Sequence, residues 1–429
     1  MRSSGAGHTQ ELPDLGTAEE LASGAPLPAP AVGRHARALA PLGVVFLATG
    51  LATALAVPFL TLFLTKAVHA GPVEVSVFLV ALPVCGIAAS SVMGRLSDGR
   101  LERRRVLLLA ALASALGSGL AAFVRDYWLL FLSGCTLLAL GRSVMPQAFA
   151  YAHDVLVGDK AQAMMTSTLR TFFSLAWVAG PPLAAALLTT GGFGVLFGAT
   201  AVLYVAVAGV AVFWLGSPRA SSERSLADGS PAPQAPNASS RTLWLTIAGL
   251  VVIQASMSVN VQDLPLYVVH DLHGGVGAAG GVLGLCAALE IPAMLGFGYL
   301  SKRFSLRGLV RLGPLIGAAY YVTAALGAHV WQLAAGQILN ACFIAIMGGL
   351  AISYIQQMLP SQPGRASTLY SNAFAGGAVL TGPLMGVAIS HGYRLPYVFA
   401  SCLTVAGFAL IIAGSVPRPA PAADARAPA

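Results

Sequence analysis

Twelve apolar stretches, each long enough to cross a lipid bilayer, follow one another along this chain of 429 residues. A helix of roughly 20 residues crosses the hydrocarbon core and satisfies its own backbone hydrogen bonds there. The sequence therefore predicts an all-α integral membrane protein with twelve transmembrane helices. The predicted spans are 39–65, 74–96, 105–124, 128–151, 164–189, 194–215, 242–269, 277–300, 308–328, 331–358, 366–390 and 395–415.

The composition agrees with a chain that lies mostly in lipid. Charged residues make up 9% of it and hydrophobic residues 56%, whereas soluble domains carry about 25% charged residues. The net charge of +8 does not indicate nucleic-acid binding, because the basic residues lie in short loops between apolar stretches.

The polar segments divide the chain into five parts. We expect a disordered cytoplasmic tail at 1–38, a six-helix half at 39–215, a cytoplasmic linker at 216–241, a second six-helix half at 242–415 and a disordered tail at 416–429. The first tail is rich in Pro, Ala, Gly and acidic residues, and the linker is rich in Ser, Pro, Ala and charge. Neither has an apolar core, which is typical of disorder.

The basic residues predict the orientation. Of the 24 Lys and Arg residues, 19 lie in the tails, the linker and the loops after even-numbered spans. Three lie on the other side of the membrane: Lys66, Arg125 and Arg394. The last two, Arg142 and Arg170, lie inside spans. Because cytoplasmic loops carry the excess of positive charge, we expect both termini in the cytoplasm. We expect the protein itself to lie in the cytoplasmic membrane.

An internal repeat supports the division at the linker. The loop that begins at Gly94 reads GRLSDGRLERRR, and the loop that begins at Gly298 reads GYLSKRFSLR. Gly180-Pro181 and Gly382-Pro383 recur at nearly the same offset. Two landmarks at one offset predict two pseudo-symmetric halves, as in secondary transporters built from parallel repeats.

Four ionisable residues lie inside predicted spans: Arg142, Arg170, Asp263 and Glu290. Such residues are costly in a bilayer and are typical of transport sites. One interpretation is a structural ion pair between the halves. The other is a site for substrate or protons, in which movement of an Arg away from a buried carboxylate would load or release a proton.

Neutral polar residues occur in the same set of spans. Gln147, Gln337, Asn340 and Asn372, together with the four ionisable residues, fall in spans 4, 5, 7, 8, 10 and 11. This distribution predicts that these six spans face a central cavity and that spans 3, 6, 9 and 12 face lipid. Trp177 lies mid-span on one helical face with Arg170, where an aromatic ring can stack on a sugar.

Catalytic and phosphate-binding motifs are not evident in the sequence, and the histidines form no ligand set. We therefore expect a protein that is not an enzyme and that needs neither a metal ion nor another cofactor.

The Gly94–Arg105 stretch resembles the loop 2–3 signature of the major facilitator superfamily. This resemblance implies a conformational latch formed by Gly94, Asp98, Arg100, Arg103 and Arg104.

Six stretches resemble the bacterial sugar efflux transporter family of that superfamily. They are MPQAFA (145–150), SLAWVAGPPLA (174–184), DLPLY (263–267), ALEIPAM (288–294), GQILNACFI (336–344) and STLYSN (367–372). The resemblance implies export of a sugar or glycoside by alternating access, in antiport with protons. It implies roles in binding or coupling for Arg170, Trp177, Asp263, Glu290, Gln337, Asn340 and Asn372. Together with the other polar residues inside the spans, this predicts a substrate-binding set of Gln147, Arg170, Trp177, Asp263, Gln337, Asn340 and Asn372, and a proton-coupling set of Glu290, Asp263, Arg170 and Arg142.

The chain departs from that family at two positions, with Ala56 in place of a Gln and Arg142 in place of a neutral residue. Arg142 resembles the span 4 Arg of drug/proton antiporters, so drug/proton antiport is the alternative function. A membrane sensor that binds a ligand without moving it is the remote alternative. Besides the substrate, the expected partners are protons and the lipid bilayer, with no nucleic acid, and we expect a monomer.

Overall fold

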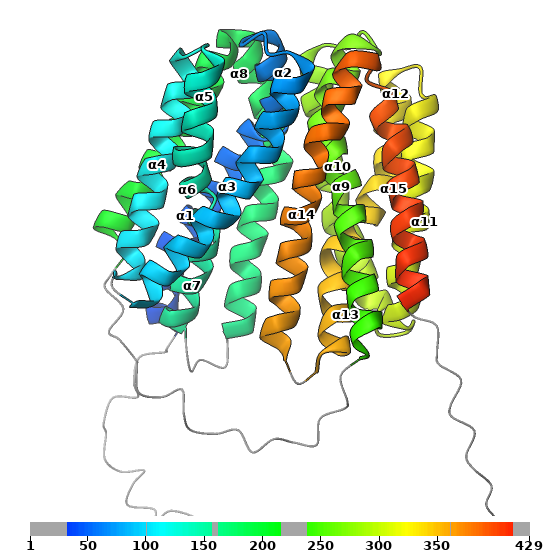
Figure 1. Cartoon of the computed structure of the whole chain (residues 1–429). Coiled ribbons are helices and arrows are strands. Elements are labelled where there is room, and N and C mark those ends of the chain that lie inside the picture. Colours follow the sequence, from blue (N-terminus) through cyan, green and yellow to red (C-terminus); the bar gives the residue numbers. More distant parts are fainter. Residues whose placement is uncertain (1–31, 100, 157–161, 216–237, 361, 415–429) are drawn as a thin grey trace, which may run out of the picture. The chain divides into compact units, whose positions relative to one another are not determined.

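The computed structural model describes residues 32–99, 101–156, 162–215, 238–360 and 362–414, and the regular structure in these ranges is helical (Figure 1). The elements are α1 (Val32–Ala56), α2 (Leu60–Lys66), α3 (Pro72–Gly99), α4 (Arg103–Phe123), α5 (Tyr127–Ser133), η1 (Gly134–Leu138), α6 (Ala139–Gly141), α7 (Val144–Leu156), α8 (Gln162–Phe213), α9 (Ser240–His270), α10 (Val276–Leu300), α11 (Leu306–Leu326), α12 (Val330–Ile344), η2 (Ala345–Leu350), α13 (Ala351–Met358), α14 (Pro363–His391) and α15 (Leu395–Gly414).

Eleven stretches of the described residues are long and apolar enough to cross a membrane, and one of them accounts for two crossings. The stretch Thr171–Phe213 has 43 residues, and a helix of that length would extend about 65 Å, roughly twice the hydrocarbon thickness. Gly192 interrupts it with φ 66° and ψ −164°, which separates two helices. The predicted all-α fold with twelve crossings is thereby confirmed.

Two crossings contain short π-helical segments. In η1 and η2 the helix takes a wider turn, which removes some carbonyl groups from the regular hydrogen-bond ladder. At η2 the hydroxyl of Tyr370, on α14, lies 2.8 Å from the carbonyl oxygen of Met347 and 3.1 Å from that of Gly348. A side chain from one span thus supplies a donor to the backbone of another.

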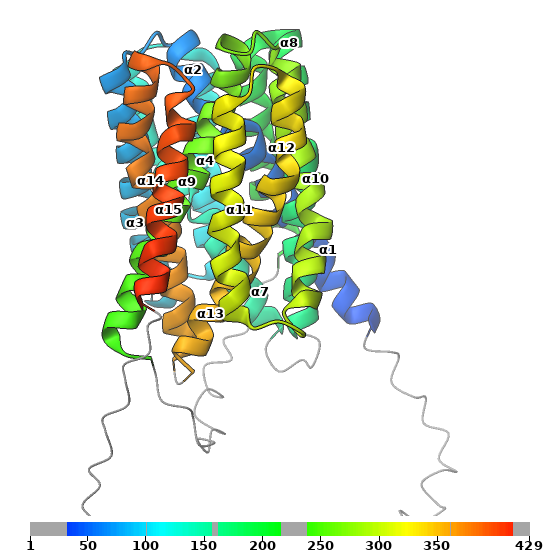
Figure 2. The same cartoon turned by 90° about the vertical axis from the view of Figure 1, so that its right-hand side faces the viewer.

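The described residues from Pro41 onward form one compact unit. On its N-terminal side α4 packs along α8, and α3 packs against η1 and α6. On its C-terminal side α9 packs against α14 and α15, while α11 lies between α12 and α15 (Figure 2).

The two sides meet where α3 contacts α14, α8 contacts α10 and α2 contacts α9. Two glycine pairs allow the close approach: Gly280 and Gly284 on α10, and Gly382 and Gly386 on α14. A Cβ atom at Gly280 would lie 2.5 Å from the carbonyl oxygen of Pro181, and one at Gly382 would lie 2.6 Å from that of Ser76. Such small-xxx-small spacing lets membrane helices touch through their backbones.

Two hydrogen bonds accompany this glycine contact between the halves. The Ser76 hydroxyl donates to the Gly382 carbonyl at 2.6 Å, and the Thr61 hydroxyl donates to Gln262 Oε1 at 2.8 Å. Thr61 lies on α2 and Ser76 lies near the start of α3. The contact therefore includes the end of the bundle that carries α2.

The predicted domain boundaries lie largely outside the described residues. The helix α1 begins at Val32, before the predicted start of the first span at 39. Residues 1–31, 216–237 and 415–429 are not described, so the disordered tails and linker stay predictions.

Candidate functional site

A chain of hydrogen bonds joins four helices in the C-terminal half. On α12, Gln337 Nε2 donates to the hydroxyl of Tyr320 at 3.1 Å, and Asn340 Nδ2 donates to Gln337 Oε1 at 2.8 Å. The Tyr320 hydroxyl, from α11, donates to Asn260 Oδ1 on α9 at 2.9 Å. Asn340 Nδ2 also lies 3.2 Å from Cys286 Sγ on α10.

Gln337 and Asn340 share one helical face, as their spacing predicts, but this face is closed in the present conformation. Gln337 is 0% exposed and Asn340 is 2% exposed. Both amides therefore hold helices together here, and their contact with a substrate stays a prediction. Asn340 Oδ1 is buried and has no hydrogen-bond partner among the described residues. The network therefore contains one unsatisfied acceptor.

Asp263 lies on α9 one turn from Asn260 and is 0% exposed. Among the described residues, neither of its carboxyl oxygens has a hydrogen-bond partner. Because the side chain of Arg170 lies outside the described residues, the structural ion pair stays a prediction. A buried, unpaired negative charge is very costly, and a bound proton removes that cost.

Aromatic residues lie near Asp263, towards the C-terminal end of α9. The ring of Tyr267, one turn further along α9, lies 4.9 Å from that of Tyr397 on α15. Tyr393, in the turn before α15, stacks on His270 at 4.9 Å. Burial, followed by the nearby carboxyl groups of Asp263 and Asp271, raises the pKa of Tyr393, so this hydroxyl keeps its proton at neutral pH.

Arg142 lies where α6 ends, within the N-terminal half, and its side chain is exposed. A Cβ atom at Gly86 would lie 2.5 Å from Arg142 Cδ, so glycine makes room for the arginine on α3. The guanidinium lies near Tyr204 of α8, whose hydroxyl is close to Thr53 and Ser114. Arg142 thus has a hydroxyl-bearing neighbour on α8, and that hydroxyl in turn meets residues of α1 and α4.

Four further candidates differ in exposure. Gln147 is 5% exposed, Trp177 and Glu290 are half-buried, and Asn372 is exposed. Gln147 Oε1 and Trp177 Nε1 are buried, and neither has a hydrogen-bond partner in the part of the chain that the structure describes. Buried polar atoms of this kind need water or a ligand, which suits both residues for binding. Glu290 follows Cys286 by one turn and acts electrostatically on its thiol, so it adjoins the end of the amide network.

Some candidates cannot be placed in full. Arg170 and Asp98 belong to α8 and α3, but their side chains lie outside what the structure describes, as does all of Arg100. Gly94 lies on α3, and a Cβ atom there would meet nothing within 4 Å.

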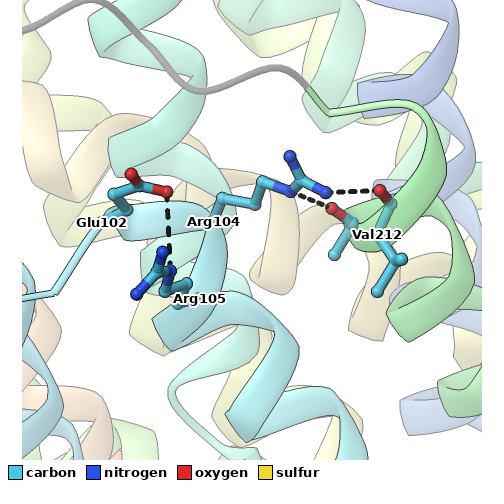
Figure 3. Close-up of polar contacts among 5 residues, drawn as sticks. Glu102, Arg104, Arg105 and Val212 are labelled. Atoms are coloured by element: carbon cyan, nitrogen blue, oxygen red, sulfur yellow. Dashed lines mark hydrogen bonds and ion pairs between the residues drawn. The ribbon is translucent and has the colours of Figure 1, made fainter.

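Arg104, which the sequence predicts to be part of a latch, has partners on a helix far along the chain (Figure 3). Its Nε donates to the carbonyl oxygen of Ala211 at 2.6 Å, and its Nη2 donates to that of Val212. These carbonyls belong to the last turn of α8, where a cation is favourable. Arg104 therefore ties the start of α4, which Arg103 begins, to the end of α8.

The sequence missed the tyrosines that complete these networks. Spans 9 and 6 were predicted to face lipid, and α11 does expose Leu312 and Leu326. Its Tyr320 points inward, however, and so does Tyr204 of α8. A tyrosine in mid-span is the signal that could have found them, because its hydroxyl needs a partner in the bilayer.

Twelve crossings, two halves that touch through glycine, and polar side chains held within the bundle define a membrane transporter. The sequence model described as Major Facilitator Superfamily matches residues 42–329. Sugar efflux transporter B of Salmonella typhimurium is 35% identical over 366 residues, which cover 85% of this chain and 92% of that protein. Sugar efflux transporter A of Dickeya chrysanthemi is 35% identical over 360 residues, covering 83% and 90%. This chain belongs to the sugar efflux transporter family of the major facilitator superfamily.

The solved structure of the nucleoside transporter NupG has the same fold. It matches with a TM-score of 0.71 and 12% identity, covering 88% of this chain and 99% of that one. At this identity the likeness concerns the fold alone.

Proposed function

We propose that this protein exports a sugar or glycoside across the cytoplasmic membrane in exchange for protons. The observation that carries the proposal is the 35% identity to two sugar efflux transporters over more than four fifths of the chain. The six stretches that carry the family resemblance also contain most of the candidate site residues.

The polar groups inside the bundle suit a sugar. A sugar presents hydroxyl groups on its edges and apolar faces on its ring. Trp177 offers a flat aromatic surface at half burial, and its Nε1 is an unpaired donor. Gln147 Oε1 is an unpaired acceptor, and Asn372 is exposed. Arg170, Asp263, Gln337 and Asn340 complete the proposed binding set once rearrangement of the halves opens the network.

Asp263 and Glu290 suit proton coupling. Asp263 is buried in the bundle, and neither carboxyl oxygen has a hydrogen-bond partner among the described residues. Its negative charge is therefore stable only when a bound proton or a cation compensates it. Glu290 is half-buried at the end of the amide network. In the proposed cycle one of these carboxyl groups carries a proton inward while the substrate leaves, and Arg170 and Arg142 approach the carboxyl groups in other states of the cycle.

The excess of Arg and Lys at the linker side supports a cytoplasmic location for the linker and both termini. We propose a monomer, since each half supplies its own part of the polar site. Arg142 is the one observation that favours drug/proton antiport, because the sugar efflux pattern has a neutral residue there.

Transport in everted membrane vesicles tests the proposal. With an acidic lumen, labelled lactose-like glycosides should accumulate inside vesicles that hold the protein, and collapse of the pH gradient should stop accumulation. A cationic dye in the same vesicles is the comparison. Export of the dye with no movement of any glycoside would reject the sugar substrate in favour of drug antiport.

A further inference from the structure

A groove of about 400 Å³ lies on the outer surface of α8 near its end. It is lined by Ala206, Gly209, Val210, Phe213 and Trp214. Phe213 is 83% exposed and Trp214 is 65% exposed, and large exposed apolar side chains on a membrane-spanning helix face lipid. A Cβ atom at Gly209 would meet nothing within 4 Å, so the missing side chain is what hollows the surface. In a bilayer a hydrocarbon chain is the natural occupant of such a hollow.

The start of α4 brings positive charge to the same place (Figure 3). Arg104 binds the carbonyls of Ala211 and Val212, which directly precede the groove residues Phe213 and Trp214. Arg104 therefore lies beside the groove, at the side of the membrane where the linker leaves α8, and Arg103 and Arg105 flank it in the sequence.

Arg105 has a different orientation from Arg104. Arg105 lies on the same face of α4 as Leu109, Leu112 and Leu116, because these residues are spaced by four, three and four positions. The three leucines are 48%, 42% and 62% exposed. These positions form one stripe along α4, and the stripe faces lipid. Arg105, whose side chain is 66% exposed, ends this stripe at the level of the lipid headgroups.

The partner that Arg105 has in the structure is weak. Its Nε lies 3.7 Å from Glu102 Oε2, and both side chains are largely exposed. Exposed ion pairs of this length contribute little. A phosphate can replace the carboxylate, because it offers more acceptor oxygens in a geometry that the guanidinium fork matches.

We propose that this groove and Arg105 form a binding site for one anionic phospholipid. The phosphate binds Arg105 at the start of α4, and one acyl chain lies in the groove over Gly209. The cluster of arginines selects an anionic headgroup, because it repels the ammonium group that a zwitterionic lipid carries next to its phosphate. Basic sites beside membrane helices bind cardiolipin in this manner.

Native mass spectrometry of the purified full-length protein tests the proposal, with cardiolipin, phosphatidylglycerol or phosphatidylcholine added in detergent. The wild type should retain cardiolipin and phosphatidylglycerol in preference to phosphatidylcholine. Arg105→Gln should lower the retained anionic lipid about five-fold, the effect of one basic side chain near the membrane surface. Gly209→Phe should fill the groove and lower the retention of all three lipids.

The matched control is Arg307→Gln. Arg307 is the exposed arginine at the start of α11, the corresponding helix of the second half. It should retain lipid as the wild type does. Equal loss in Arg105→Gln and Arg307→Gln would overturn the proposal, since the effect would then be one of net charge. Equal retention of phosphatidylcholine and cardiolipin by the wild type would overturn it too. Glycoside transport by each variant reports that the fold is intact.

Discussion

Substitution of Gly280 by valine should hold the transporter open at the end where the halves now meet. A Cβ atom at this position would lie 2.5 Å from the Pro181 carbonyl oxygen and 2.6 Å from Ala185 Cβ. Neither the backbone of α8 nor its alanine can move aside as a flexible side chain would, so α10 and α8 have to separate. Overpacking of this kind costs about 1–3 kcal/mol, and the cost falls on the closed state alone.

The expected loss of transport follows from a cost that falls on the closed state alone. A penalty of about 1–3 kcal/mol on one of two states shifts their ratio by roughly 5- to 150-fold. Because the closed state is an obligatory step of alternating access, the rate of glycoside export should fall by a comparable factor, while the amount of folded protein in the membrane changes little.

Accessibility measures the shift directly. Ser76 lies in the same contact and donates to the Gly382 carbonyl at 2.6 Å. In a background where the five native cysteines are replaced by serine, Ser76→Cys should react slowly with a membrane-impermeant maleimide added outside intact cells. Adding Gly280→Val should speed the reaction several-fold.

The control lies one residue further along α10. A Cβ atom at Gly281 would meet nothing within 4 Å, so Gly281→Val has the same effect on helix propensity without the clash. If Gly281→Val slows export as much as Gly280→Val does, or if Gly280→Val leaves export and labelling unchanged, the closed contact does not depend on glycine and our reasoning fails.

Three other predictions concern coupling, substrate and topology. Glu290→Gln should abolish export driven by a proton gradient while downhill exchange of substrate persists in part; normal uphill export would show that Glu290 is structural and leave coupling to Asp263. Asn340→Leu should lower glycoside transport strongly, because each buried hydrogen-bonding group left unpaired costs roughly 1–3 kcal/mol, whereas export of a hydrophobic dye should be spared; equal loss of both would mean that Asn340 only supports the fold. A reporter fused after Ser230 should be active only as a cytoplasmic reporter, and a periplasmic signal there would contradict the division into two halves.

The sequence predicted the spans well because a bilayer imposes one strong rule on length and polarity. Ten of the eleven stretches follow the predicted boundaries closely, and the eleventh contains two predicted spans, which Gly192 separates. The rule acts along the chain, so it needs no knowledge of which helices touch.

The site was harder to predict because neighbours across helices leave little trace in the sequence. The residues Gln337 and Asn340 were found, but their burial depends on Tyr320 from another span. Arg142 was paired with carboxylates by charge alone, yet the structure gives it Tyr204 as a neighbour. A side chain can be exposed in one state of the transport cycle and buried in another. The composition of the chain does not indicate which state a structure represents.

The wide turn at η2 has a mechanical consequence. Tyr370 of α14 supplies the donor for the carbonyls of Met347 and Gly348. If α14 slid along α12 and α13, both of these hydrogen bonds would break inside the bilayer, where an unpaired polar group costs several kcal/mol. These two crossings should therefore move as one rigid body. Probes attached to them should stay at a constant distance at every stage of transport.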